Sequence, residues 1–473
     1  MNAPSASPST APEAAVAELV RRARVAMRDF YPSDQARVDE AVTALAWSIY
    51  KPEHARELAA LAVRDTGLGN VPDKITKKQR KTFGTLRDLL RGRSVGVIEE
   101  DPVRGLVKYA KPVGVVAAVT PSTNPGATPV NKAMMAVKGR NAVIVAPSPS
   151  GIVTTTRTVE LMRRELGRIG APEDLVQVLS PPVDKALTNA LMRASDLVVV
   201  TGSQNNVRAA YSSGKPAIGV GAGNVPVIID ATADLDDAAR KIHDSKTFDN
   251  ATSCSSENSV VILDAVYEAA MDALERAGGY RASAEEKAQI RDTLWVGGKL
   301  NRKVIAKDAD VFAAAAGLPE ASAGARFFMV EDDDIGPDNP FCDEKLALVL
   351  SVYRARDLDD AVAKVRAILD VKGRGHSCGI HTREIANARR LAEELDVVRV
   401  LVNQAHTFGN GGGFDSGLNF TLSMGCGTWQ GNSISENLSY RHFLNITHLS
   451  TVIPEDRPSE EALFGAYWAK YGR

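Results

Sequence analysis

Cysteine is scarce in this chain, which has four cysteines among 473 residues: Cys254, Cys342, Cys378 and Cys426. So few cysteines in so long a chain do not form a disulfide framework, and no two of them have the spacing of a metal-ligating pair. The seven histidines form no His-x-x-x-His unit either, so we expect no metal site. This usage fits a reducing, cytoplasmic environment best.

Two further absences concern charge and long apolar runs. The 57 basic residues nearly balance the 58 acidic ones, for a net charge of -1, which argues against nucleic acid or an acidic membrane as a partner. No apolar run approaches the roughly 18 residues that span a bilayer, so we expect no membrane segment. The opening stretch "MNAPSASPSTAP" lacks the basic start and the apolar region of a signal peptide. We therefore expect residues 1–13 to be a disordered tail.

The pattern that is present begins with helices. Residues 14–48 are rich in alanine, with apolar positions three and four residues apart, and helical patterning continues to about residue 91. Residues 92–112 are predicted to be extended, with a turn near Asp101 and Pro102. From Val113 short apolar strands alternate with helices. The predicted strands are 113–120, 141–147, 175–180, 197–202 and 217–221, and the helices between them are 127–138, 153–167, 184–193 and 204–213.

Such alternation predicts a parallel sheet covered on both faces, with ligands bound beyond the carboxyl ends of its strands. A second α/β section is expected from about residue 227. Its predicted helices are 232–246, 265–277, 358–369 and 383–395, and its predicted strands are 259–263, 347–355, 378–382 and 397–404. The glycine-rich stretch 408–419 is predicted to be a mobile or ligand-facing loop.

The stretch "VTGSQNN" (200–206) lies where an apolar strand gives way to a helix. Gly202 permits close approach of the backbone to a ligand, and the Ser203 hydroxyl with the first N–H groups of the helix would attract a phosphate. Ser203 is equally a favoured helix N-cap, which requires no ligand. The usual G-x-G-x-x-G dinucleotide fingerprint is absent from this region.

Asn124 lies in "VTPSTNPGATP" (119–129), where two prolines bracket a rigid connector at the carboxyl edge of the predicted sheet. Its amide there would be able to donate to an oxyanion, although a plain turn residue is the alternative. Cys254 lies in "FDNATSCSSENSVVIL", where small polar neighbours indicate an accessible loop. An accessible free thiol is a liability unless it is used, whereas a packed cysteine behaves as a small hydrophobe. We expect Cys378 and Cys426 to be packed.

Six motifs occur here in an order that resembles the CoA-acylating branch of the aldehyde dehydrogenase superfamily. They are "PSTNP", "VTGSQNN", "GKPAIGVGAGNVPVIID", "FDNATSCSSEN", "DEKLALVLSVYRARD" and "GCGTWQGNSISEN", and the resemblance covers roughly residues 100 to 450. It implies an α/β fold with a Rossmann-like parallel-sheet cofactor domain, an α/β catalytic domain and a small oligomerisation hairpin. The implied domains are 14–226 for the cofactor, including an oligomerisation segment at about 92–112, then 227–425 for catalysis. Residues 426–473 would return to the cofactor domain and form a C-terminal oligomerisation segment.

The resemblance also implies roles for single residues. Cys254 matches the family nucleophile, and Asn124 matches the amide that holds the oxyanion together with the Cys254 backbone N–H. Glu344 matches the carboxylate that binds the nicotinamide ribose. The pyrophosphate and remaining cofactor positions fall on Gly202, Ser203, Thr120, Pro121 and Gly221. No role falls to a metal.

Two departures from the family pattern carry expectations of their own. Where hydrolytic members have a Glu-Leu-Gly-Gly motif whose Glu activates water, alignment on Pro226 gives Val220 to Gly223. Valine takes no proton, so a thioester on Cys254 would persist until a CoA thiolate arrived. After strand 141–147, "APSPSG" lacks the Lys and the acidic residue of NAD-preferring members. Ser148 or Ser150 would be able to donate to a 2′-phosphate, which favours NADP over NAD.

The resemblance implies a small aldehyde and CoA as reactants, and a homodimer or homotetramer. Sulfoacetaldehyde is the favoured aldehyde, with acetaldehyde, propionaldehyde and glycolaldehyde as alternatives. A hydrolytic aldehyde dehydrogenase and a non-catalytic nucleotide-binding protein of the same fold remain open. Groups considered for a sulfonate pocket are Arg441, His442, His406 and the loop 409–413. Glu257 and Glu436 are candidates for proton transfer, with capping or ion pairing as the simpler role.

Overall fold

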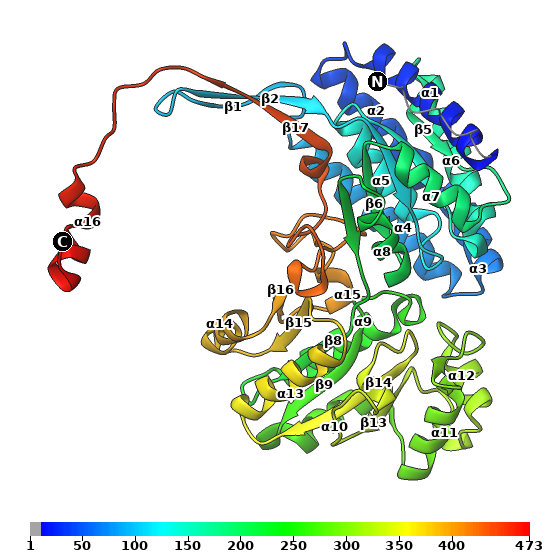
Figure 1. The fold of residues 1–473 in the computed structure, drawn as a ribbon. Coiled ribbons are helices and arrows are strands. Elements are labelled where there is room, and N and C mark those ends of the chain that lie inside the picture. The colour runs from blue at the N-terminus through cyan, green and yellow to red at the C-terminus, as the bar shows by residue number, and fades with distance from the viewer. Residues whose placement is uncertain (1–10) are drawn as a thin grey trace, which may run out of the picture.

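A computed structural model describes residues 11–473, and its first elements are four helices (Figure 1). They are α1 (Ala11–Phe30), α2 (Gln35–Tyr50), α3 (Pro52–Thr66) and α4 (Val71–Leu90). Asp34 and Asn70 cap α2 and α4 by accepting backbone N–H groups of the first turn. The predicted disordered tail lies mostly on residues 1–10, outside the described residues, whereas residues 11–13 already belong to α1.

Five parallel strands form the first sheet, as the strand–helix alternation predicts. In spatial order they are β5 (Val176–Val178), β4 (Ala142–Ala146), β3 (Val115–Val119), β6 (Leu197–Thr201) and β7 (Ala217–Val220). The connecting helices are α5 (Ala127–Lys138), α6 (Ile152–Arg168), α7 (Lys185–Ala194) and α8 (Gln204–Tyr211). α2, α5 and α6 pack together, whereas α7 packs with α1 and α8, so the sheet lies between two helical layers. The strands are almost wholly buried, as their continuous apolar runs require.

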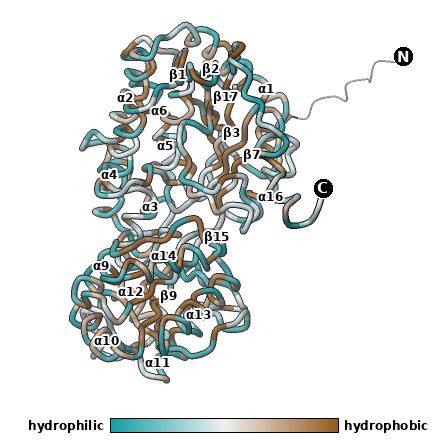
Figure 2. The backbone as a smooth tube through the Cα atoms, turned by 90° about the vertical axis from the view of Figure 1, so that its left-hand side faces the viewer, coloured by the Kyte–Doolittle hydropathy of each residue, from teal (hydrophilic) through white to brown (hydrophobic). Residues whose placement is uncertain are grey.

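A seven-stranded parallel sheet forms the second α/β unit. Its order is β10 (Gly279–Arg281), β13 (Phe327–Glu331), β14 (Val349–Ala355), β9 (Glu257–Leu263), β8 (Val225–Ile229), β15 (Gly375–His381) and β16 (Val397–Val402). The helices against it are α9 (Leu235–Thr247), α10 (Tyr267–Arg276), α13 (Leu358–Val371) and α14 (Ile385–Glu394). Figure 2 shows the hydrophobic residues concentrated along the strands inside both units.

The sequence-based prediction missed several elements of this second unit. It names no strand at β8, where Pro226 interrupts the usual strand signal. It also names nothing between residues 278 and 346, where the structure adds shorter elements to β10 and β13. These are α11 (Ala284–Leu294), β11 (Trp295–Val296), β12 (Lys299–Leu300) and α12 (Ala309–Ala316).

A third, antiparallel sheet leaves the body of the protein as an arm. It consists of β1 (Gly96–Asp101), β2 (Leu106–Pro112) and β17 (Leu444–Ser450), with the turn of the hairpin after Asp101 as predicted. Beyond β17 the chain runs on to α16 (Glu460–Tyr471), which lies apart from both units (Figure 1). Strand β17, near the end of the chain, therefore pairs with residues 106–112 of the hairpin.

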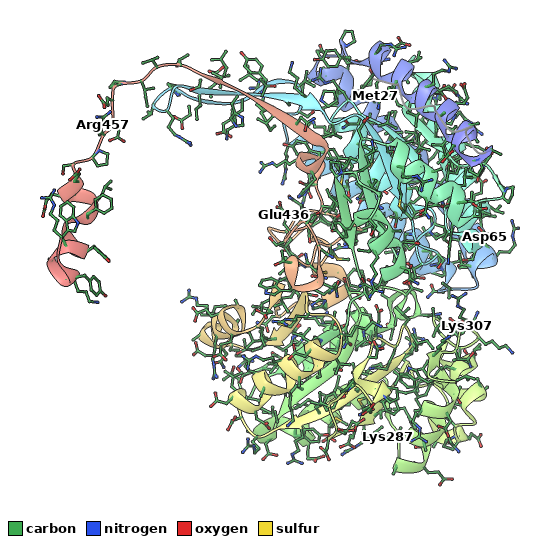
Figure 3. The ribbon with its side chains drawn as sticks, in the orientation of Figure 1. Met27, Asp65, Lys287, Lys307, Glu436 and Arg457 are labelled. Carbon is green, nitrogen blue, oxygen red and sulfur yellow. The ribbon has the colours of Figure 1, made fainter. Side chains whose placement is uncertain are left out.

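The two α/β units meet at α3, α4 and the loop after α9. Lys307, labelled at this boundary in Figure 3, donates from its Nζ to Gly67 O at 2.5 Å. The backbone passes from the five-stranded to the seven-stranded sheet through residues 221–224, between β7 and β8. The predicted domain limits remain a prediction. Within residues 11–473 no helix combines the length and the apolarity that a membrane span requires.

We predict that Asn141 is a main support of the fold, because its buried amide joins three segments. Its Oδ1 accepts from Val113 N at 2.7 Å and Gly114 N at 3.0 Å, and its Nδ2 donates to Ala136 O and Phe443 O. Each backbone group left unpaired costs about 1–3 kcal/mol. Asn141→Ala should lower the free energy of unfolding by about 3 kcal/mol or more in urea titrations.

The matched control is Asn445→Ala on β17. Asn445 is exposed, and its amide makes a single 3.4 Å contact with Pro112 O. Its loss should change the free energy of unfolding by about 0.5 kcal/mol or less. Equal effects of the two substitutions would contradict the assignment.

Candidate active site

The predicted cofactor residues gather at one edge of the five-stranded sheet. β4, β3, β6 and β7 are neighbours and parallel, so the loops after them share the carboxyl edge. These loops hold, in that strand order, Ser148 and Ser150, Thr120 and Pro121, Gly202 and Ser203, and Gly221. The structure thus brings together residues separated by up to a hundred positions in sequence, at the place where such sheets bind nucleotides.

Individual contacts at this edge fit a dinucleotide. Ser203 is exposed and caps α8, accepting from Asn206 N at 3.4 Å, so the simple capping role is present and the first N–H groups of α8 face the same edge. The hydroxyls of Ser148 and Ser150 lie 3.4 Å apart toward solvent. A Cβ at Gly221 would meet the side-chain amides of Gln204 and Gln430, which border this loop. Phosphate binding by these groups remains a prediction.

Cys254 differs from the other three cysteines in its exposure. Cys342, Cys378 and Cys426 are fully buried, as expected for Cys378 and Cys426, whereas Cys254 is partly exposed. Ser253 and Cys254 are the two partly exposed positions between buried Thr252 and the buried strand β9. Cys254 is thus the one cysteine of the four that is not fully buried.

The loop before Cys254 has an unusual backbone. Asp249, Asn250 and Ala251 follow α9 with φ of 52°, 53° and 58°, a left-handed conformation that costs energy for residues other than glycine. Asp249 Oδ2 accepts from Lys74 Nζ at 3.0 Å and from Lys77 Nζ at 2.5 Å. Asn250 Nδ2 donates to Asp308 Oδ1 at 2.7 Å. These buried contacts hold the turn that delivers Cys254.

The residues after Cys254 are also held by contacts with other segments. Ser255 Oγ accepts from Asn410 Nδ2 at 2.9 Å, and His406 Nδ1 lies 3.0 Å from Ser255 O. On the other side, Gly223 passes so close that a Cβ there would overlap the Cys254 carbonyl oxygen. The position of Cys254 is therefore fixed by contacts from three directions, and Gly223 has room only for hydrogen.

The electrostatics around the thiol favour its neutral form. Burial raises the pKa of the Cys254 thiol to about 12, and the Glu344 carboxylate adds to the rise, whereas Arg399 opposes it. Burial raises the pKa of Glu344 to about 7, against the effects of Lys372 and of the Gly223 N–H. The structure thus places Glu344, a predicted cofactor residue, beside the predicted nucleophile.

Asn124 lines a small cavity together with Ser253, the residue before Cys254. No hydrogen bond joins its side-chain amide to another residue within 11–473, so its N–H groups are free to donate. The opposite wall of this cavity comes from α4, with Lys77, Arg80 and Lys81. Sequence reasoning missed these three residues, although the basic run "KITKKQRKTFG" on a helix was the available signal.

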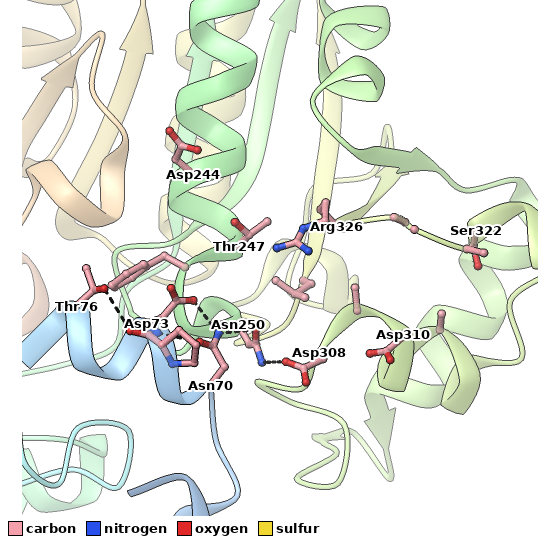
Figure 4. A pocket seen from close by; sticks show the side chains of 18 of the residues that line it. Asn70, Asp73, Thr76, Asp244, Thr247, Asn250, Asp308, Asp310, Ser322 and Arg326 are labelled. Carbon is pink, nitrogen blue, oxygen red and sulfur yellow. Dashed lines mark hydrogen bonds between the residues drawn. The ribbon is translucent and has the colours of Figure 1, made fainter. Parts of the chain in front are cut away.

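A larger cavity of about 1110 Å³ adjoins the small one (Figure 4). Its labelled wall residues come from the start of α4, the end of α9 and the region around α12. Phe248 and Phe408, with ring centroids 4.7 Å apart, line both cavities. The two cavities therefore share a wall that is made of these two rings.

None of the groups predicted for a sulfonate pocket lines either of these two cavities. His406 is buried against Ser255, His442 Nε2 lies 3.1 Å from Glu436 Oε1, and Arg441 is exposed. Residues 409–413 of the predicted glycine-rich loop are buried, and Gly411 O accepts from Lys81 Nζ at 2.8 Å, whereas residues 414–419 are mostly exposed.

Glu257 and Glu436 both have the simpler structural role. The carboxylate of Glu257 is buried and accepts from the Ser245 hydroxyl and from His406 N. Burial raises its pKa to about 7. Glu436 forms the ion pair with His442 described above.

In the described part of the chain no three His, Cys, Asp or Glu side chains gather in a way that would hold a metal ion. The chemistry that the described residues offer is that of a thiol with a carboxylate close by, and of a free amide that lines a cavity with the residue before that thiol. Such a constellation suits covalent catalysis on a carbonyl carbon.

Comparison with known proteins agrees with this geometry. Residues 2–280 match the model of the aldehyde dehydrogenase family. The chain is 52% identical to an acylating sulfoacetaldehyde dehydrogenase of Cupriavidus necator, covering 98% of this chain and 95% of that protein. It is 43% identical to an acylating sulfoacetaldehyde dehydrogenase of Bilophila wadsworthia, covering 96% and 98%. An acetylating aldehyde dehydrogenase of Geobacillus thermoglucosidasius has the same fold, with a TM-score of 0.91, 33% identity and coverage of 95% and 98%. The chain belongs to the aldehyde dehydrogenase family.

Proposed function

We propose that this protein is a CoA-acylating aldehyde dehydrogenase that converts sulfoacetaldehyde, CoA and NAD(P)⁺ to sulfoacetyl-CoA and NAD(P)H. The observation that carries the acylating reaction is Val220. It lies buried at the end of β7, at the position where hydrolytic members have their water-activating Glu. The identity of the aldehyde is supported by the two sulfoacetaldehyde dehydrogenases that this chain resembles over nearly its whole length.

The first half of the reaction uses Cys254 and Asn124. The Cys254 sulfur, after losing its proton to solvent, attacks the carbonyl carbon of the aldehyde. The Asn124 amide and the Cys254 backbone N–H donate to the oxygen that becomes negative. A bound nicotinamide supplies the hydride acceptor. Loss of hydride from the aldehyde carbon leaves an acyl group on Cys254 as a thioester.

The second half depends on what cannot attack that thioester. Val220 provides no base for water, so the acyl group remains on Cys254 until the CoA thiol displaces it and regenerates the free thiol. The product is an acyl-CoA, and the sequence of steps is ping-pong. Run in reverse, the same groups reduce an acyl-CoA to the aldehyde.

The cofactor preference that we propose is NADP. Ser148 and Ser150 present two hydroxyls after β4, and the stretch 146–151 contains no carboxylate that would repel a 2′-phosphate. The pyrophosphate would lie against Gly202, Ser203 and the N-terminus of α8. Thr120, Pro121 and Gly221 border the same edge, and Glu344 reaches the nicotinamide end.

We further propose that the enzyme is a homodimer or homotetramer held together through the arm. α16 has no buried residue, and Leu463, Phe464 and Tyr467 are exposed on it. An apolar helix carried away from the body at the end of an extended segment fits a surface on a second copy of the chain. The sheet of β1, β2 and β17 would anchor α16 to its own subunit.

The reaction is tested with a panel of aldehydes, each with and without CoA and with NAD⁺ or NADP⁺. Reduced nicotinamide should form from sulfoacetaldehyde in a CoA-dependent way, and it should not form with Cys254→Ala. Cys378→Ala, at a buried thiol, is the control and should retain activity. CoA-independent turnover to the free acid would contradict the acylating assignment.

The raised pKa of Cys254 predicts how the thiol reacts in the absence of cofactor. At pH 7 only about one thiol in 10⁵ is ionised when the pKa is about 12. Iodoacetamide should therefore modify Cys254 slowly at pH 7, and about tenfold faster for each further pH unit. Glu344→Gln removes a nearby negative charge, so it should lower this pKa and speed modification at pH 8.5 by about threefold or more.

Glu436→Gln is the matched control, because Glu436 is exposed and pairs with His442 away from the thiol. It should leave the rate of modification unchanged. If Glu344→Gln and Glu436→Gln behave alike, then Glu344 does not influence Cys254 as described.

Truncation after Ser450 tests whether α16 holds the oligomer together. Removing residues 451–473 deletes α16 and its connection but keeps the strand pairing of β17 with β2. The molar mass measured by light scattering should fall relative to that of the full chain. Phe464→Glu should have the same effect, whereas Val311→Glu at an exposed site on α12 should not. An unchanged mass after truncation would place the oligomer interface elsewhere.

A further inference from the structure

Helix α4 buries a row of cations. Lys74, Lys77, Lys78 and Lys81 are 2%, 5%, 3% and 8% exposed, and their spacing places them on one face of the helix. Lysine is almost never fully buried unless it is paired. Among residues 11–473, the one carboxylate in ion-pair contact with these four side chains is that of Asp249, which contacts Lys74 and Lys77. The row therefore carries more positive than negative charge.

The excess of positive charge disfavours the charged forms of Lys78 and Lys81. Burial and the neighbouring cations lower the pKa of each to about 7. Lys78 Nζ reaches Lys74 O at 3.4 Å, and Lys81 Nζ reaches Gly411 O at 2.8 Å, so both bond to backbone oxygen rather than to a carboxylate. A nearby anion would stabilise the charged form of both lysines.

Arg80 is the cation with the most unused bonding capacity. Its guanidinium carbon lies 5.3 Å from the ring centres of Phe408 and Phe414 and 5.8 Å from that of Phe420. These rings hold the guanidinium without accepting its N–H groups in ordinary hydrogen bonds. Within the described chain Arg80 forms no hydrogen bond and no ion pair, and its Nε is buried without a partner. Arg80 is itself only partly buried, and none of its five N–H groups is used by another described residue.

The position of these donors relative to Asn124 matters most. Arg80, Lys77 and Lys81 line the same small cavity as Asn124 and Ser253. Because Asn124 lines this cavity of about 30 Å³, an aldehyde whose carbonyl oxygen accepts from Asn124 would have its next substituent beside it. In sulfoacetaldehyde a single methylene separates the carbonyl carbon from the sulfonate, so the sulfonate falls beside the cations. A planar guanidinium fork matches two oxygens of such an oxyanion.

We infer that the cavity between α4 and Asn124 is the binding site for the sulfonate of the aldehyde, and that Arg80 is the residue that selects an anionic aldehyde over a neutral one. The inference rests on the proposed function for the position of the carbonyl group. Lys77 and Lys81 contribute charge, while their bonds to Asp249 and Gly411 give them structural roles as well. Arg80 has no such second role in hydrogen bonding, which makes it the residue to test.

The test compares sulfoacetaldehyde with 3,3-dimethylbutanal, in which a neutral tert-butyl group replaces the sulfonate at nearly the same size. Arg80→Gln should lower kcat/KM for sulfoacetaldehyde by roughly 10- to 100-fold, mainly through KM, as expected for lost hydrogen bonds to a charged group. The value for 3,3-dimethylbutanal should stay within about threefold. Arg80→Lys keeps the positive charge but loses the planar guanidinium, so its kcat/KM for sulfoacetaldehyde should lie between the values of the wild type and of Arg80→Gln.

Arg87→Gln is the matched control. Arg87 lies on the same helix and stacks on Phe414 and Phe420 at 5.3 Å and 5.0 Å, but it pairs with Asp88 and does not line the cavity. It should not change the ratio between the two aldehydes. If Arg80→Gln matches Arg87→Gln, or lowers both aldehydes equally, the inference is wrong while the proposed reaction stands. If Arg80→Gln does not fold, the two-aldehyde ratio of Arg80→Lys decides in the same way.

A second readout separates this inference from the proposed substrate. Ethanesulfonate cannot react, and it should inhibit the wild-type enzyme in competition with whichever aldehyde the enzyme oxidises. Its inhibition constant should be about tenfold higher for Arg80→Gln. Arg80-dependent inhibition without turnover of sulfoacetaldehyde would keep the anion site and overturn the proposed substrate. Inhibition that is absent, or that is unchanged in Arg80→Gln, would overturn the anion site.

Discussion

The buried contact of Asp249 with Lys74 and Lys77 is the interaction on which the site depends. Burial alone would raise the pKa of Asp249, but the two lysines outweigh it and hold that pKa below its usual value. Asp249 Oδ2 also accepts from Thr252 Oγ1 at 2.7 Å, inside the loop that carries Cys254. A left-handed turn of three residues other than glycine needs such support, because its conformation is unfavourable by itself. One carboxylate thus joins α4 of the first part of the chain to the nucleophile loop of the second.

Helix α4 therefore has two roles, and both depend on its buried positive charge. Its first two lysines neutralise Asp249 and position Cys254. Its next turn, with Arg80 and Lys81, continues the cationic row beyond the reach of that carboxylate. Lys81 is buried without a carboxylate partner among the described residues, which is costly, so a fold selected for stability alone would replace it. Its retention beside Asn124 is explained by a ligand that supplies the missing negative charge.

Much of the architecture follows from the sequence, because buried parallel strands are short and continuously apolar and because prolines and glycines mark their ends. The five-stranded sheet and its helices were predicted within a few residues. β8 was missed since Pro226 lies within it, and residues 278–346 were missed since their elements are short.

For the site, Cys254 and Asn124 came from motifs, and strand order explains why Thr120, Ser148, Gly202 and Gly221 share an edge. Arg80 was missed because a basic run on a helix resembles a solvated face. Its guanidinium packs against Phe408, Phe414 and Phe420, which are more than 300 residues away in sequence.

The proposed chemistry requires two negative groups close together, the Cys254 thiolate and the sulfonate, in a place where burial and Glu344 already disfavour the thiolate. A sulfonate bound near an unscreened thiol would raise the thiol pKa further and slow the attack. The charge of Lys81 interacts directly with Cys254, and Arg80 lines the cavity beside it, so these cations offset the charge of the substrate as well as binding it. A neutral aldehyde needs no such compensation. The cationic row is then as much a condition for the nucleophile to act on an anionic aldehyde as it is a means of recognising one.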